Sequence, residues 1–188
     1  MDKTPFKVYL IETIGNNRQG RGFKMEPEVH IIEKYFQEVL LCFTMTNIRC
    51  KGGKEIDLLA INPKTLEKFH IEARVTVSGF KIAKIDTYTK KGKRIGTAHR
   101  IGLDFFNKEK FEHEAIKKKI LDVFGEVPYR KILVVWNVED DSVIPYAKET
   151  YKIEIWKIQE MLQRFGKYVS GSRDDVLRTM ELVYLSHE

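Results

Sequence analysis

Two acidic residues and a cation stand at spacings that suit the cutting of phosphodiester bonds. Asp57 lies in a short apolar run that follows the Gly52-Gly53 turn. Glu72 and Arg74 lie two positions apart in a second run, after a proline turn. Because strand side chains alternate between the faces of a sheet, a hairpin of these runs places Asp57 beside Glu72, with Arg74 next along the strand. Two carboxylates and a fixed cation at one sheet edge favour a hard metal ion that activates water.

An ordinary explanation stands beside this one. A strand that carries Glu72 and Arg74 on its polar face is often a solvated antiparallel edge, with no function of its own. Asp57 fits equally well as an acid next to a turn. His70 shares the face of Glu72 and is expected to be an ordinary polar-face histidine, with substrate contact as the alternative.

The elements around these residues predict an α/β fold. Pro27, with Glu26 and Glu28 around it, favours a helix from residue 27 to about residue 40. A nearly continuous apolar run at 131–138 is typical of a strand buried on both faces. The other expected elements are a β-rich run at 6–14, a basic glycine-rich loop at 15–22, strands at 41–49 and 152–156, and helices at 108–124, 157–166 and 173–186. This order predicts a mixed central sheet flanked by helices, with extra helices at the C-terminus.

The two motif strands resemble those of a known nuclease group. Gly53-Lys54-Glu55-Ile56-Asp57 and Glu72-Ala73-Arg74 resemble the G-x-(E/K)-(I/V)-D and E-x-K strands of the PD-(D/E)XK superfamily, in the version of archaeal Holliday-junction resolvases and Mrr-type restriction enzymes. The resemblance covers about residues 20 to 80, and the rest only by element order; an arginine replaces the motif lysine. It implies one restriction-endonuclease-like domain over 1–188, with its core at about 20–140 and a C-terminal strand and helices at 150–188.

The same resemblance implies a Mg²⁺ or Mn²⁺ site. Asp57, Glu72 and the backbone carbonyl of Ala73 would hold the ion, and a glutamate on the first helix would add a further ligand. Glu28 is the first choice for that glutamate, since apolar residues follow it at helical spacing, and Glu26 is the second. Either acid would also favour the positive end of the helix dipole without any function.

Arg74 is the departure that bears most on catalysis. An arginine can hold phosphate oxygens with its planar fork, but it does not act as a base because its pKa stays above about 12. Three outcomes follow: an activated water suffices, a lysine from elsewhere fills in (Lys81 and Lys84 are nearest), or cleavage has been lost.

The charge of the chain favours an anionic partner. The net charge is +6 and the isoelectric point is near 9.1, and a basic segment directly follows the second motif strand. A loop of this kind lying on nucleic-acid phosphates is the preferred interpretation, and a solvated loop is the alternative. The residues expected to contact nucleic acid are Lys81, Lys84, Lys90, Lys91, Lys93, Arg94 and Arg100.

Several other classes of protein are not supported. The chain has no apolar run of the ~18 residues that a membrane span needs and no signal peptide at its start, so a cytoplasmic protein without a membrane partner is expected. Cys42 and Cys50 lack zinc-ligand spacing. The expectation is a metal-dependent DNA endonuclease acting on duplex or branched DNA, with RNA still open as a substrate and a homodimer as a candidate assembly. The alternative is a degenerate nuclease-fold protein that binds nucleic acid or serves as an assembly subunit.

Overall fold

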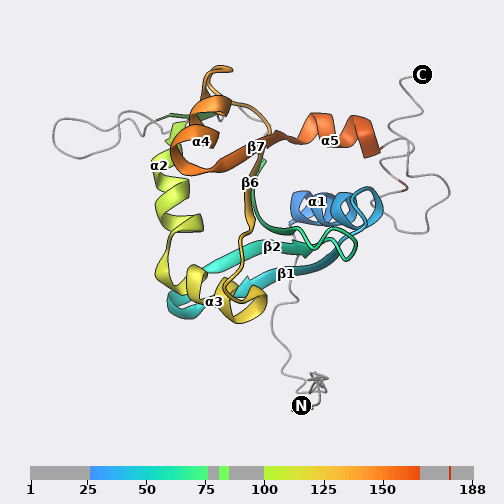
Figure 1. Ribbon diagram of the computed structural model, residues 1–188. Coiled ribbons are helices and arrows are strands. Elements are labelled where there is room, and N and C mark those ends of the chain that lie inside the picture. The colour runs from blue at the N-terminus through green and yellow to red at the C-terminus, as the bar shows by residue number, and fades with distance from the viewer. Residues whose placement is uncertain (1–25, 76–80, 85–99, 166–177, 179–188) are drawn as a thin grey trace, which may run out of the picture.

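A mixed five-stranded sheet is the centre of the structure (Figure 1). The computed structural model describes residues 26–75, 81–84 and 100–165, together with residue 178. The strands of this sheet are β1 (Phe43–Arg49), β2 (Glu55–Ile61), β3 (Lys68–Arg74), β6 (Arg130–Val135) and β7 (Ile153–Lys157), in the order β1-β2-β3-β6-β7. The first three pair antiparallel, and β3, β6 and β7 pair parallel. The predicted mixed α/β fold is confirmed, and β3 is a central strand rather than a solvated edge.

Helices cover both faces of the sheet. Figure 1 shows α1 (Pro27–Glu38) and α5 (Ile158–Phe165) on one side, and α2 (Leu103–Phe106), α3 (Glu114–Phe124) and α4 (Val143–Tyr151) on the other. The core under α1 and α5 is formed by Ile32, Tyr35, Phe36, Phe69, Ile71, Ile132, Val134, Met161 and Phe165, among others. The core under α2 and α4 includes Leu103, Phe106, Leu133, Val135, Val143 and Ala147. Apolar packing on both faces therefore holds β3 and β6 rigidly.

The expected helix at 108–124 is wrong in its first part. Residues 103–106 form α2, and a π-helical turn η2 (Asn107–Phe111) follows it directly. The backbone N–H of Glu112 closes this turn on the Asn107 carbonyl at 2.7 Å. His113 then adopts an extended backbone and caps α3, its Nδ1 accepting from the Ala115 N–H at 3.3 Å. The regular apolar spacing therefore concealed a break at residues 112–113.

Two helices, α2 and α4, were not predicted. Helix α4 connects β6 to β7, which run parallel and so need a crossover connection. Pro145 lies in its first turn, where the missing N–H costs no helical hydrogen bond.

The basic segment begins and ends in strands rather than being a loop throughout. Strand β4 (Lys81–Ala83) pairs in parallel with β5 (Arg100–Gly102), with Lys81 opposite Arg100. The predicted contacts Lys90, Lys91, Lys93 and Arg94 lie outside the described residues, as do the run at 6–14, the loop at 15–22 and the helix at 173–186. No helix in the part of the chain that the structure describes has both the length and the apolar character needed to cross a membrane.

Candidate active site

A row of polar side chains crosses the three antiparallel strands. Extending the pairing of β1 with β2, and of β2 with β3, sets Asn47 opposite Asp57 and Asp57 opposite Glu72. Asn47 has a positive φ of 51° inside its strand, a conformation that asparagine tolerates better than most residues. Non-glycine residues in this region tend to occur where function constrains the backbone. The alternation of the two motif strands therefore brings together the acids that the sequence singled out.

Asp57 lies where β2 and β3 separate. The backbone ladder between the strands ends at the Leu58–Ile71 pair, and beyond it Asp57 Oδ2 accepts a hydrogen bond from the Ala73 N–H at 2.8 Å. Burial and then the charge of Glu72 raise the pKa of Asp57 to about 6, although Lys110 and the Ala73 N–H act in the opposite direction. Lys110 and the Ala73 N–H therefore do not compensate for the burial of the Asp57 carboxylate and for the charge of Glu72.

Glu72 is the most deeply buried acid of the site, with 1% of its side chain exposed. Its Oε1 lies 2.9 Å from His70 Nε2, and its Oε2 lies 2.7 Å from Lys110 Nζ. The Lys110 contact is an ion pair without hydrogen-bond geometry, so Oε2 accepts no hydrogen bond from the described residues. Burial raises the pKa of Glu72 to about 7, against the lowering effect of Lys110.

His70 is wholly buried, so the expected polar-face histidine is wrong. Its ring packs against the Phe111 ring at 4.8 Å between centroids. Burial lowers the pKa of His70 to about 3, which keeps the ring neutral at physiological pH. A neutral ring beside a carboxylate carries its proton on Nε2 and donates it to Glu72 Oε1, which fixes the orientation of that carboxylate.

Lys110 is the functional candidate that the sequence analysis missed. Its Nζ lies 2.7 Å from Glu72 Oε2 and 3.6 Å from Asp57 Oδ1, so one ammonium contacts both acids. Burial lowers the pKa of Lys110, but the charges of Glu72 and Asp57 outweigh this effect and hold the pKa above its usual value. The π-helical turn η2 delivers this lysine, and an ion pair between Lys54 Nζ and Glu109 Oε2 at 2.7 Å ties the same turn to the start of β2. Single π turns are frequent at functional sites.

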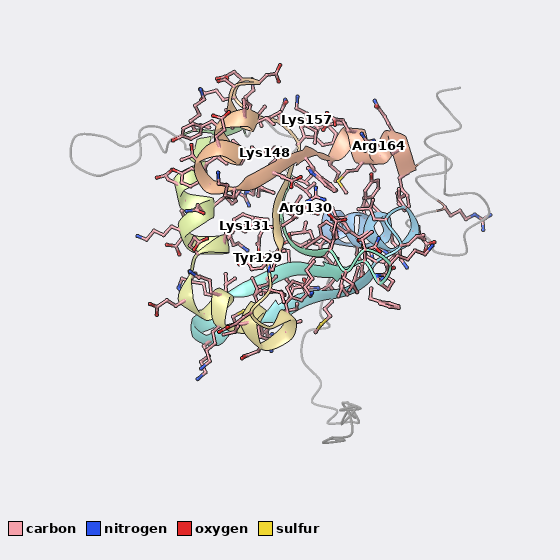
Figure 2. The ribbon with its side chains drawn as sticks, viewed as in Figure 1. Tyr129, Arg130, Lys131, Lys148, Lys157 and Arg164 are labelled. Atoms are coloured by element: carbon pink, nitrogen blue, oxygen red, sulfur yellow. The ribbon has the colours of Figure 1, made fainter. Side chains whose placement is uncertain are left out.

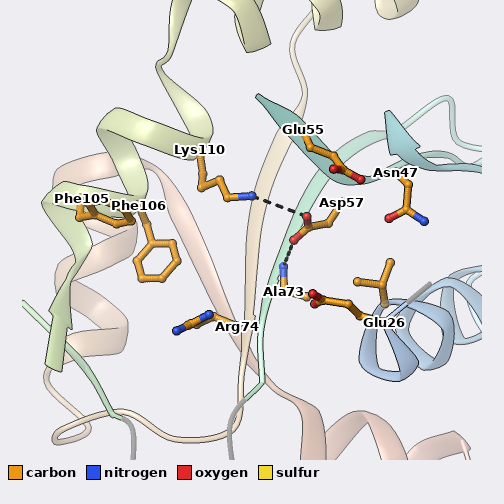
Figure 3. Close-up of a pocket in the computed structure, with 10 residues that line it drawn as sticks. Glu26, Asn47, Glu55, Asp57, Ala73, Arg74, Phe105, Phe106 and Lys110 are labelled. Carbon is orange, nitrogen blue, oxygen red and sulfur yellow. Dashed lines mark hydrogen bonds and ion pairs between the residues drawn. The ribbon is translucent and has the colours of Figure 1, made fainter. Parts of the chain in front are cut away.

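Asp57 opens onto a cleft of about 570 Å³ (Figure 3), whereas the buried Glu72 is not part of the lining. The lining residues are Glu26, Val29, Asn47, Glu55, Asp57, Ala73, Arg74, Phe105, Phe106 and Lys110. Of the two helix acids, the second choice Glu26 lines the cleft, whereas Glu28 is not part of the lining. Arg74 shares the cleft with Asp57 and Lys110, while Lys81 and Lys84 do not.

Three basic side chains on β6 and β7, away from this cleft, have acidic partners. Figure 2 labels these three, Arg130, Lys131 and Lys157. Arg130 pairs with Glu154 at 2.6 Å, Lys131 pairs with Glu112, and Lys157 pairs with Asp141 at 3.3 Å. Lys84 instead lies 5.7 Å above the Tyr146 ring. Lys110 differs from them because it lines a cleft together with one of its acidic partners, Asp57.

The donor atoms fit a hard divalent ion. No group of three or more histidine, cysteine, aspartate or glutamate side chains within the described ranges is arranged to hold a metal. Mg²⁺, however, keeps several waters and is commonly held by one or two carboxylates. Asp57, Glu72 and the Ala73 carbonyl supply only oxygen donors, and the buried Glu72 Oε2 has no hydrogen bond. A bound cation would stabilise the charged forms of Asp57 and Glu72 and so lower their raised pKa values.

Fold and site together define a mixed α/β protein in which one lysine contacts the half-buried Asp57 and the buried Glu72. No protein-family model matches the chain, and no curated protein matches it. One solved structure is similar, titled "Crystal Structure of Protein of Unknown Function AF1548". Its sequence is 15% identical, the TM-score is 0.45, and the match covers 76% of this chain and 67% of that one.

Proposed function

We propose that this chain is a metal-dependent endonuclease of the PD-(D/E)XK superfamily that hydrolyses phosphodiester bonds in DNA. The observation that carries the proposal is the contact of Lys110 with both acids, Asp57 and Glu72, each within 4 Å of its ammonium, beside a cleft that Asp57 and Lys110 line. The acids are those of the two motif strands. The lysine comes from η2 rather than from the position of the motif lysine, and it supports the expectation that a lysine from elsewhere replaces the one that Arg74 displaces.

Asp57, Glu72 and the Ala73 carbonyl are the proposed ligands of Mg²⁺ or Mn²⁺. When bound there, the ion would supply positive charge beside the scissile phosphate and a more acidic attacking water. Glu26 lines the same cleft and is the proposed helix acid. His70 holds Glu72 in place from behind, through its hydrogen bond to Oε1.

Lys110 and Arg74 are the proposed phosphate-binding cations. The raised pKa of Lys110 keeps it protonated at neutral pH, so it stabilises negative charge and does not accept a proton from water. Arg74 has the same limit, because a guanidinium remains protonated in proteins. Both side chains line the cleft that Asp57 faces, and charged groups fixed in advance around a reacting phosphate are an effective form of catalysis.

DNA is the proposed substrate because of the basic segment beyond β3. The pairing of β4 with β5 sets Lys81 and Arg100 side by side on the backbone, so the segment starts and ends at one place. Contacts of such lysines and arginines to phosphates carry little sequence information. A homodimer with two such clefts would cut both strands of a duplex, and RNA is a second polymer to be tested.

A second function is favoured by one specific contact. The Lys110 ammonium lies between the two acids, where a divalent ion would bind, and such a pairing would also suit a site that has lost its metal. The chain would then bind nucleic acid without cutting it. Lys110 is one-third exposed, which leaves it room to turn toward a phosphate when an ion is present.

Cleavage of end-labelled duplex, single-stranded and four-way-junction DNA, and of matching RNA, tests the proposal in Mg²⁺ and in Mn²⁺. The variants are Asp57→Asn and Glu72→Gln, and the matched control is Asp122→Asn, an exposed acid on α3. Metal-dependent cleavage that both site variants abolish and the control keeps is the expected result. Salt-sensitive binding without cleavage in any metal supports the second function. A protein that neither binds nor cuts nucleic acid overturns both proposed functions.

A further inference from the structure

The cleft contains an exposed aromatic ring that hydrolysis at the acid pair does not require. Phe105 of α2 is 41% exposed, whereas Phe106 is 4% exposed and Leu103 is fully buried. The short helix α2 therefore packs two of its apolar residues in the core and turns the third outward. An isolated exposed apolar residue is common on protein surfaces. The exposure of Phe105 therefore indicates no function by itself, and its position in the cleft is the relevant observation.

Phe105 is held in place beside the charged part of the cleft. Its ring meets the Phe106 ring edge to face, with 5.7 Å between centroids and an angle of 88° between the planes. Phe105 and Lys110 come from consecutive turns of the same segment, and both line the cleft with Arg74 and Asp57 (Figure 3). The cleft thus brings an exposed aromatic ring together with two cations and with the acids Glu26, Glu55 and Asp57.

A nucleotide has the matching chemistry, since it joins a flat base to an anionic phosphate. The cleft volume of about 570 Å³ lies within the range of sites that bind small ligands, roughly 300–1,000 Å³. The faces of a base inside a duplex are covered by its neighbours, so Phe105 can stack only on a base that is unpaired or terminal. Stacking on an aromatic side chain strengthens binding about 5- to 150-fold per base and tolerates any sequence.

We propose that Phe105 stacks on an unpaired base of the strand whose phosphate lies at Arg74 and Lys110. The substrate class is then a nucleic acid with an unpaired nucleotide at the cut, such as a single strand, a flap or the open centre of a branched molecule. This inference rests on the proposed function for the position of the phosphate, but the stacking itself requires no cleavage.

The test uses the full chain and a short single-stranded oligonucleotide that carries one 2-aminopurine, whose fluorescence falls when it stacks. The same strand in a blunt duplex is the comparison, and binding is titrated with Ca²⁺ and again with EDTA. Phe105→Leu keeps an apolar side chain without the aromatic face, and Phe105→Trp keeps the face. Phe43→Leu is the control, because Phe43 is 70% exposed on β1 and does not line the cleft.

We expect Phe105→Leu to weaken single-strand binding about 5- to 150-fold and to remove the fluorescence change, while duplex affinity stays the same. Phe105→Trp and Phe43→Leu should bind the single strand as the wild type does. Equal single-strand affinity of Phe105→Leu and wild type overturns the inference, and metal-dependent cleavage lost in Asp57→Asn would still support the proposed function. If stacking depends on Phe105 but the protein cleaves no substrate, the stacking inference is supported and the proposed nuclease function is overturned. A wild-type protein that binds no nucleic acid overturns both.

Discussion

Replacing Glu72 by glutamine should make the protein more stable at about pH 8. The carboxylate is 1% exposed, and burial raises its pKa from 4.5 to about 7. A group whose pKa is higher in the folded state contributes stability that is present below the unfolded pKa and lost as the pH rises through the folded pKa. The wild type therefore loses this contribution between about pH 4.5 and pH 7. Glutamine carries no charge and loses nothing in this range.

The size of the gain follows from the pKa rise. One pKa unit corresponds to about 1.4 kcal/mol, so a rise from 4.5 to about 7 corresponds to about 3 kcal/mol above pH 7. For a chain of 188 residues this is a rise in Tm of about 6–12 °C. Glutamine has nearly the same volume, and its amide oxygen still accepts from His70 Nε2. Lys110 keeps Asp57 as a partner and is one-third exposed, so the loss of its contact with the Glu72 charge costs little stability.

Urea denaturation at about pH 8 and about pH 4 measures the effect, without divalent ions. The gap between Glu72→Gln and wild type should be large at the higher pH and close at the lower one, where Glu72 is protonated in both states. His70 has the opposite pH dependence because its pKa is lowered, but it is present in both proteins and cancels in the difference. Glu126→Gln, an exposed acid after α3, is the control and should change little. A Glu72→Gln protein that is equally or less stable at pH 8 would refute the reasoning, since it would mean that Lys110 fully compensates the burial.

Three further substitutions probe the surroundings of Glu72. Lys110→Met should reduce cleavage about 10²- to 10³-fold in a single-turnover assay, while Lys108→Met, an exposed neighbour in the same turn, should not; equal loss in both would assign the effect to the turn itself. Arg74→Lys should change the cleavage rate by less than about tenfold because Lys110 already supplies an ammonium, and a much larger gain would mark the native site as degenerate. His70→Leu should cost about 1–3 kcal/mol in urea denaturation at about pH 8 because the charged Glu72 Oε1 loses its donor. The cost should shrink in the Glu72→Gln background, where the lost hydrogen bond joins two neutral groups; an equal cost in both would mean that packing, not the charged hydrogen bond, is lost.

The acid pair could be predicted because it depends on local pattern alone. Strict alternation set Asp57 and Glu72 on one face, and the Gly52-Gly53 turn, where both residues have φ of 71°, sets the start of β2. The sheet register then follows from which face is apolar. These are properties of adjacent residues, so a single sequence is enough to read them.

Lys110 could not be predicted in the same way. Its segment has helical spacing, but a π turn has a different phase from an α-helix, and one such turn redirects Lys110 toward the sheet. The spacing of Phe106 and Phe111, both buried, is five residues and was the available signal. The burial of His70 depends on the same turn, because Phe111 covers its ring. Alternation predicts which side chains share a face, but not what covers that face.

Helix α4 was missed although a topological argument was at hand. The predicted strands at 131–138 and 152–156 are separated by thirteen residues, and parallel neighbours need a crossover of about a dozen residues, usually a helix. Pro145 is no argument against this helix, since it lies in the first turn, where proline is accepted. The direction of the strands, rather than propensity, would have identified this helix.

The buried charge of Glu72 destabilises the folded protein, and packing alone does not explain why a carboxylate stands at this position. Buried ion pairs can often be replaced by apolar residues of similar size with no loss, or with a gain, in stability. Leu133 of β6, which stands opposite Glu72 in the register, is apolar and fully buried. A carboxylate on a central strand, held by a buried histidine and turned toward a lysine in a cleft, is therefore better explained by a charge that the site needs. Stability and cleavage should respond differently to this mutation: at about pH 8 Glu72→Gln should gain stability whether or not the site cuts, but it loses cleavage only if the charge serves catalysis. A different outcome is that the wild type cleaves in no metal, while Glu72→Gln is more stable and binds single strands as the wild type does. That combination would identify Glu72 as the remnant of a lost metal site.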